Sequence, residues 1–269
     1  MEACYFGTDS HRLYGVVPEA VDSASTALVF CPPFAEEMVT TYARFATWAK
    51  QLEAAGIPVV RFHPFGTGES GGSFGDFTLT SGVSDACGAA ELARRRISPN
   101  RLGYFGLRLG ATIAMLAACK RPVDLLVLWS PVTNIPQYMR ELFRGLLAKE
   151  MVRQGVTQVR RNTQDMIAEL ETERPVDMMG YEFSPQLYRE MANAGKWPET
   201  PSARHVFWLA RPAEEKSATA IVDQWRKSDS RIDFAVLPEP AFWEEFGSTF
   251  ADRFAAKTLE WLKQTVKAR

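Results

Sequence analysis

The stretch Arg101-Leu-Gly-Tyr-Phe-Gly-Leu-Arg-Leu-Gly-Ala-Thr112 has the clearest link to chemistry in this chain. It is typical of an apolar strand, a turn bracketed by Gly106 and Gly110, and an Ala-rich helix. The G-x-S-x-G nucleophile elbow has this context, and its strained turn exposes a reactive serine. Arg108 stands where that serine belongs. Because a guanidinium stays protonated and binds anions instead of attacking carbonyls, we expect no acyl-enzyme at this turn.

A serine at such an elbow works with an acid after a later strand and a histidine after the last strand. Glu214 and Glu215 follow the apolar run 205–210 and are candidates for the acid, with a solvated surface position as the alternative. Phe242 and Trp243 follow the last predicted strand, and no histidine occurs beyond His205. The sequence therefore predicts a degenerate Ser-His-Asp site that lacks its base as well as its nucleophile.

Other polar residues could rescue catalysis. His63 follows the run 58–62, and we expect it to hold the adjacent glycine-rich loop more readily than to act in catalysis. Cys31 and Ser130 end apolar runs without a neighbouring base, so we expect packing and turn roles for them. An esterase or thioesterase with an unrecognised nucleophile stays an alternative. We expect His11 to be exposed and His205 to lie at the opposite edge of the sheet.

The loop Cys31-Pro-Pro-Phe-Ala-Glu-Glu-Met38 is expected to supply one backbone N–H of an oxyanion hole. Glu36 and Glu37 then lie beside Arg108. Either an Arg–Glu pair fills the site, or Arg108 and the helix N-terminus near Leu109 bind a carboxylate or phosphate. An unpaired buried guanidinium is costly, so Arg108 needs one of these partners. The residues that we expect around a ligand are Arg108, Phe34, Ala35, Leu109, Glu36, Phe242 and Trp243.

The elements that position these residues follow from hydrophobic patterns. Apolar runs alternate with helical patterns, which predicts a parallel sheet covered by helices. The predicted strands are 27–31, 58–62, 123–129, 205–210 and 232–237, together with the apolar strand that opens the stretch 101–112 and a hairpin over 3–6 and 12–17. Residues 131–200 show helical periods and no convincing strand. We therefore predict an α/β-hydrolase fold, with a mostly parallel central sheet flanked by helices, a core of residues 1–130 and 201–269, and an inserted helical cap over 131–200.

Composition excludes several function classes. The 269 residues are 46% hydrophobic with a net charge of -1, which favours a large core and gives no reason to expect nucleic acid as a partner. We expect no membrane span, because no run of about 18 apolar residues occurs. Four cysteines without paired spacing and three histidines without H-x-x-H predict reduced thiols, no metal site and no cofactor. With no signal-peptide pattern at the N-terminus, we expect a cytoplasmic location.

Taken together, these residues resemble the second type of the exosortase A system-associated hydrolases, which are α/β-hydrolase-fold proteins. The resemblance rests on Pro33-Phe-Ala-Glu-Glu-Met38, Gly106-Leu-Arg-Leu-Gly110, Gly180-Tyr181 and Phe242-Trp243. It implies that arginine is normal at the elbow. It also implies a small-molecule or carrier-bound acyl ligand, because acyl ligases and acyl-carrier proteins tend to accompany this family.

We therefore expect a member of the α/β-hydrolase superfamily that binds or acts on an acyl-type or carboxylate ligand without a serine acyl-enzyme. Oxyanion stabilisation and positioning alone retain about 10³–10⁴-fold catalysis in enzymes that lack their triad, so turnover stays open. A non-catalytic partner in a biosynthetic assembly is the main alternative. Whether the chain forms a homodimer also stays open.

Overall fold

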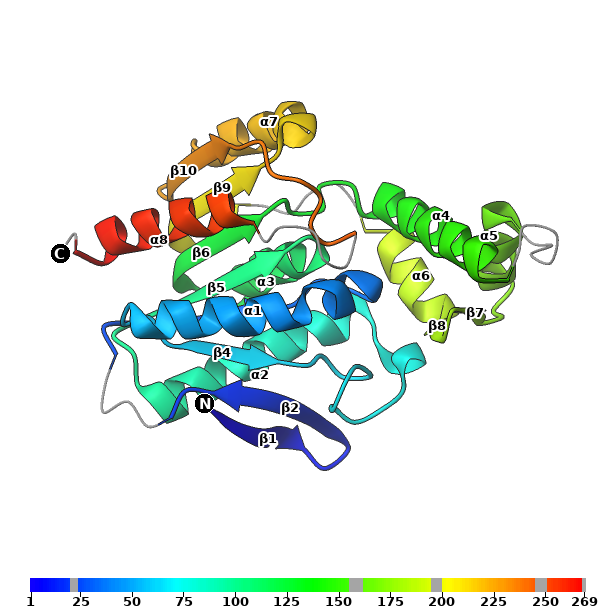
Figure 1. Ribbon diagram of the computed structural model, residues 1–269, viewed down its shortest axis with the longest axis horizontal. Helices are drawn as coiled ribbons and strands as arrows, with labels where there is room; N and C mark the ends of the chain where they lie inside the picture. The colour runs from blue at the N-terminus through cyan, green and yellow to red at the C-terminus, as the bar shows by residue number, and fades with distance from the viewer. Residues whose placement is uncertain (20–23, 155–161, 195–199, 245–250, 268–269) are drawn as a thin grey trace.

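The computed structural model describes residues 1–19, 24–154, 162–194, 200–244 and 251–267 (Figure 1). Within these residues, eight strands form one sheet in the order β1-β2-β4-β3-β5-β6-β9-β10. The strands β1 and β2 form an antiparallel hairpin, β2 pairs antiparallel with β4, and the remaining pairs are parallel. The strands are β1 Glu2–Thr8, β2 His11–Val17, β3 Thr26–Cys31, β4 Val59–Phe62, β5 Arg101–Leu107, β6 Val123–Trp129, β9 Ala203–Ala210 and β10 Arg231–Val236.

Helices cover both faces of this sheet. One buried cluster joins α1 and α8 to one face, and a second joins α2, α3 and α7 to the other (Figure 1). The strand β3 is buried at every position because it is covered from both sides, which explains its continuous apolar sequence. The helices are α1 Glu36–Ala54, α2 Leu79–Ile97, α3 Leu109–Lys120, α7 Glu215–Trp225 and α8 Asp252–Lys267, with short 3₁₀ turns η1 at Phe74–Asp76 and η2 at Pro212–Glu214. The predicted α/β-hydrolase fold is confirmed.

The segment between β6 and β9 stands beside the sheet (Figure 1). It contains α4 Ile135–Gln154, α5 Thr163–Glu171 and α6 Pro185–Ala192, as its helical periods predict. The expectation of no strand there is wrong, because β7 Val176–Met178 pairs with β8 Tyr181–Phe183. Their two-residue turn has φ of 56° at Met179 and 89° at Gly180, as a type I′ turn requires. Strands of three residues, joined by Met-Gly instead of Asn-Gly, are too short and atypical to give a sequence signal.

His11 keeps 39% of its side chain exposed, but it is not a free surface residue. Its Nε2 lies 2.6 Å from Oδ1 of Asp85, and its ring stacks on Phe65 at 4.1 Å between centroids. Asp85 is buried on α2 and also accepts the N–H of Phe65 at 2.8 Å. Burial raises the pKa of the Asp85 carboxyl, which makes these partners necessary. This interaction ties the first hairpin to α2 across 74 residues, a separation that no local pattern could reveal.

None of the described helices is both long enough and apolar enough to cross a membrane. All four cysteines are free thiols. The helical pattern near the end of the chain predicts a closing helix from about residue 248 to 267. The structure has α8 from Asp252, and residues 248–250 lie outside the described residues.

Candidate functional site

Arg108 occupies a strained turn between β5 and α3. Its φ of 55° and ψ of −125° lie in a sparsely populated region for a non-glycine residue. Backbone bonds hold it there: its N–H donates to the carbonyl of Trp129 at 3.1 Å, and its own carbonyl accepts from Ala111 and Thr112. The turn therefore has the strand–turn–helix geometry of a nucleophile elbow, with a guanidinium in place of a hydroxyl.

The two glycines of the elbow are required by close packing. A Cβ at Gly106 would lie 2.5 Å from the carbonyl oxygen of Gly110. A Cβ at Gly110 would lie 2.3 Å from the carbonyl oxygens of Cys31 and Pro32. The start of α3 is thus pressed against β5 and against the loop after β3. A side chain at Gly106 would push α3 away from β5, and one at Gly110 would push α3 away from that loop.

Arg108 forms an ion pair with Glu37. Its Nε lies 3.2 Å from Oε1 of Glu37, and Oε2 of the same carboxylate accepts the hydroxyl of Tyr138 at 3.0 Å. The side chains of Arg108 and Glu37 are 15% and 11% exposed. Burial raises the pKa of Glu37 although Arg108 and Tyr138 lower it. Of the two partners expected for Arg108, the structure has the protein carboxylate.

Trp243 lies where the general base of a triad would follow the last strand. The Cζ atom of Arg108 is 4.9 Å from the centroid of its ring, and the Cζ atom of Arg211 is 4.6 Å from it. Arg211 in turn binds Glu214 through Nε at 2.9 Å. Glu214, the candidate acid, is therefore engaged by an arginine, and the indole that follows the last strand contacts two cations.

A cavity of about 400 Å³ opens above this ion pair. The long helix α4 forms one wall with side chains spaced three to four residues apart, which places them on one helical face. The cavity is lined by Glu36, Glu37, Arg108, Tyr138, Glu141, Leu142, Gly145, Leu146, Ala148, Lys149, Trp243 and Glu244. Glu36 accepts from Lys149 of α4 at 3.3 Å and from Tyr181 of β8 at 3.0 Å. The two neighbouring glutamates thus both bind residues from the segment between β6 and β9.

The structure brings three of the seven residues expected around a ligand to this cavity, Glu36, Arg108 and Trp243, together with Glu37, the expected partner of Arg108. The side chains of Phe34, Ala35, Leu109 and Phe242 are buried and do not line it. Leu109 is the first residue of α3, so its N–H has no acceptor within the helix. Sequence reasoning missed Tyr138 and Lys149. Their spacing with Glu141 and Leu142 on one face of α4 is the signal that could have found them.

Comparison with known proteins agrees with this geometry. Residues 25–205 match the family model described as serine aminopeptidase, S33. The chain belongs to this family of hydrolases. No curated protein matches the sequence significantly.

Solved structures support the fold of this S33 member over its whole length. Est1E from Butyrivibrio proteoclasticus, solved with ferulic acid, is 14% identical with a TM-score of 0.66, covering 98% of this chain and 99% of its own. The α/β hydrolase GrgF from Penicillium sp. sh18 is 16% identical with a TM-score of 0.64, covering 98% of each chain. A putative hydrolase from Agrobacterium vitis S4 is 15% identical with a TM-score of 0.62, covering 99% and 98%. At these identities the likeness concerns the fold alone.

The family description names a serine, yet this S33 member has arginine at the elbow. Ser130 follows β6 at a φ of 41°, and its buried hydroxyl has no hydrogen-bond partner among the described residues. Burial raises the pKa of the Cys31 thiol well above its usual value, so that this thiol stays protonated and unreactive.

His63, the remaining candidate, does not line the cavity of this S33 member. Its Nδ1 accepts the N–H of Glu69 at 3.0 Å, and its carbonyl accepts the hydroxyl of Ser70. These contacts hold the glycine-rich loop, as expected. Burial and the nearby Arg61 lower the pKa of His63, so its ring is neutral at neutral pH.

Proposed function

We propose that this protein binds an acyl-type ligand through its carbonyl oxygen, in the cavity above Arg108, and forms no serine acyl-enzyme. The observation that carries the proposal is the state of Arg108. Glu37 holds its Nε at 3.2 Å, while the guanidinium keeps 15% exposure and lines the cavity. The other N–H groups of this fixed guanidinium are preorganised donors for a ligand oxygen.

The charges around the cavity favour a neutral carbonyl over a free carboxylate. Glu37 neutralises Arg108 and Lys149 binds Glu36, so the carboxylates of Glu141 and Glu244 leave the cavity lining with an excess of negative charge. A ligand carboxylate would meet like charges, whereas an ester, amide or thioester carbonyl brings only a partial charge. The hypothesis of an acyl ligand is therefore better supported than that of a free carboxylate.

The segments that resemble the exosortase A system-associated hydrolases meet around this cavity. Glu36 and Glu37, Arg108, Tyr181 and Trp243 come from four separate parts of the chain and touch one another as described above. Such convergence supports a shared site over four unrelated likenesses.

A non-catalytic partner in a biosynthetic assembly is the second candidate. The observation that favours it is the occupation of the two remaining triad positions, with Trp243 for the base and Glu214 engaged by Arg211. No imidazole is available to take a proton there, because no histidine follows His205. Binding without turnover is the simpler consequence of this arrangement.

The proposal includes two further features. Residues 131–200 act as a cap, supported by Glu36 and Glu37, which bind Tyr138, Lys149 and Tyr181. The protein works in the cytoplasm, supported by its free thiols. A homodimer is an arrangement that gel filtration can test.

The ligand proposal is tested by titrating the protein with S-hexanoyl-N-acetylcysteamine and with hexanoate. Trp243 lines the cavity, so its fluorescence reports binding. We expect the thioester to bind about tenfold more tightly than hexanoate, and Arg108→Gln to weaken thioester binding about tenfold. Arg211→Gln is the matched control, because Arg211 stacks on the same indole without lining the cavity. Equal binding of both probes, or an effect of Arg211→Gln alone, would contradict the proposal.

Covalent chemistry is tested with a fluorophosphonate probe, which needs an activated serine. We expect no labelling of the protein, and no ester hydrolysis by Arg108→Ser alone, since it restores a hydroxyl without a base. Combining Arg108→Ser with Trp243→His supplies an imidazole in the region of the base, and p-nitrophenyl ester turnover is expected only there. Stoichiometric labelling of Ser130 in the unmodified protein would instead support the esterase alternative.

A further inference from the structure

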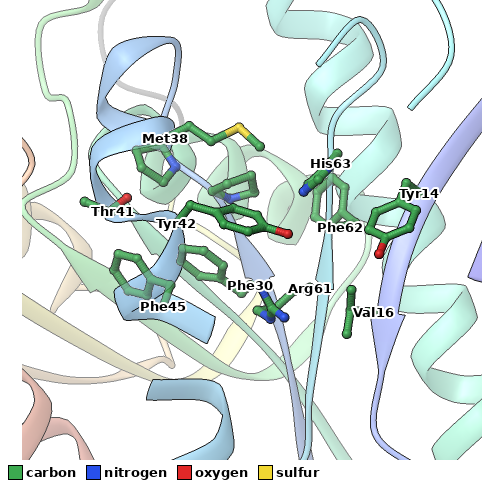
Figure 2. Close-up of a pocket in the computed structure, with 12 residues that line it drawn as sticks. Tyr14, Val16, Phe30, Met38, Thr41, Tyr42, Phe45, Arg61, Phe62 and His63 are labelled. Atoms are coloured by element: carbon green, nitrogen blue, oxygen red, sulfur yellow. The ribbon is translucent and has the colours of Figure 1, made fainter. Parts of the chain in front are cut away.

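A second pocket lies on the α1 face of the sheet, apart from the cavity at Arg108 (Figure 2). It is formed by α1, β2, β3 and β4, and most of its lining side chains are apolar or aromatic. Its enclosed free volume is about 20 Å³, enough for one water-sized group, and its empty space including the open mouth is about 360 Å³. A ligand would therefore insert one small group and rest the remainder of its body in the mouth.

Arg61 brings a charge into these apolar surroundings. It stands opposite Val16 on β2 and Phe30 on β3, and its Cζ atom lies 5.7 Å from the ring centroid of Tyr42. Its Nε is buried and has no hydrogen-bond acceptor among the described residues. No described carboxylate forms an ion pair with it. Arg61 is half-buried, and its Nε–H is shielded from water without an acceptor, so an anionic ligand in this pocket would meet an unused donor and an unpaired charge.

Further donors surround the same space. His63 accepts the N–H of Glu69 through Nδ1, so the proton of its neutral ring is on Nε2. The side chain of Tyr42 is 41% exposed, and Figure 2 shows its hydroxyl pointing toward the space between His63 and Arg61. A carboxylate in this space would meet one cation and two neutral donors. A doubly charged phosphate would exceed the single charge of Arg61.

Aromatic rings continue from the pocket along the sheet. Centroid distances are 5.4 Å between Tyr42 and His63, 5.0 Å between His63 and Tyr14, and 5.7 Å between Tyr14 and Tyr5. Tyr5 is 54% exposed. The exposed rings of Tyr5 and Tyr42 offer edges and faces to another ring, which a flexible aliphatic chain uses less well.

We propose that this pocket binds a small aromatic carboxylate, with its carboxylate on Arg61 and its ring against Tyr42 and Tyr14. The bond from the guanidinium to the carboxylate is charge-assisted and shielded from water by the apolar walls, which strengthens it. No bond is made or broken in this step. The site is independent of the acyl ligand proposed for Arg108, because none of the residues that line one pocket lines the other.

The experiment is calorimetric titration of the full chain with benzoate and, in a second series, with benzyl alcohol, which has the ring without the charge. We expect saturable binding of benzoate and at least about tenfold weaker binding of benzyl alcohol. Arg61→Gln should weaken benzoate binding about tenfold. Arg12→Gln is the matched control. Arg12, on β2, has its Cζ atom 4.6 Å from the ring centroid of Tyr5 but does not line the pocket. It should change the affinity by no more than about twofold.

Arg108→Gln separates the two sites and should leave benzoate binding within about twofold of the unmodified protein. If Arg61→Gln does not fold, Arg61→Lys and Tyr42→Ala decide: weaker binding in both supports the site, and unchanged affinity in both overturns it. The proposal is also overturned by equal binding of the two probes, or by absence of saturable benzoate binding. Loss of binding in Arg108→Gln but not in Arg61→Gln would likewise overturn it, because benzoate would then bind in the cavity at Arg108.

Discussion

Arg108 and Arg61 are two half-buried cations that the fold treats differently. Arg108 has its own carboxylate, Glu37, and lies against the rings of Tyr138 and Trp243. Arg61 lies over Tyr42 and has no described acid partner. In the first region the protein completes the charge balance by itself, whereas in the second the balance is left to solvent or to a ligand. Burial of an arginine therefore does not by itself indicate an anion site. Such a site is indicated only where the protein supplies no carboxylate for the guanidinium.

The largest expected difference between the two regions is in stability. Arg108→Met should lower the free energy of unfolding by about 3–5 kcal/mol, because it leaves Glu37 buried without its cation. Arg61→Met breaks no described ion pair and should change it by less than about 1 kcal/mol. Urea denaturation of both variants measures this. The double variant Arg108→Met with Glu37→Gln should recover part of the loss, and strictly additive losses would rule out direct coupling.

The pH dependence of that loss sharpens the comparison. Burial raises the pKa of Glu37, and Arg108→Met removes a neighbour that lowers it. In the variant the folded state then binds the Glu37 proton more tightly than the unfolded state does. Its stability is greatest below the ordinary pKa of a glutamate and falls as the pH rises through the folded pKa. The deficit should be larger at about pH 8 than at about pH 5, whereas Arg61→Met should show no such trend.

The smallest expected effect concerns the two tyrosines. Tyr138→Phe removes the hydroxyl that donates to Glu37 at 3.0 Å and should cost about 1–3 kcal/mol. Tyr42→Phe removes a hydroxyl from a residue that is 41% exposed and should cost less than about 0.5 kcal/mol. Thermal unfolding of both single variants measures the difference. Equal losses would mean that Glu37 does not depend on Tyr138.

Local signals in the sequence were sufficient for most of the fold and for the elbow. The glycine frame around Arg108 and the alternation of strands and helices are patterns within a few residues, and both were found in the structure. The β7–β8 hairpin could not be predicted from the sequence, because its strands are short and its turn begins with Met179. Methionine is unusual at the positive φ of this turn, so the turn gives no sequence signal.

The partners in the site could not be predicted in the same way. Glu36 and Glu37 are adjacent, and the sequence gives no reason why Glu37 binds Arg108 while Glu36 binds Lys149 and Tyr181. Neighbouring side chains on a helix point about 100° apart, so the orientation of α1 about its axis decides which glutamate faces Arg108. Tertiary packing sets that orientation. Tyr138 reaches Glu37 across 101 residues of chain. The residues that line the pocket at Arg61 also come from strands far apart in the sequence, so no sequence motif could predict this pocket.

The pairing of Arg108 with Glu37 has a consequence for the descent of the protein. A lineage that replaced Arg108 by serine in one step would strand the carboxylate of Glu37 in a buried place. It would lose stability before an imidazole could arise at position 243, so it would gain no activity in exchange. A single change from Arg108 to serine would thus cost stability without a gain in activity to offset it. Because Arg108 and Glu37 stabilise each other, replacing the arginine without loss of stability requires a change at position 37 as well.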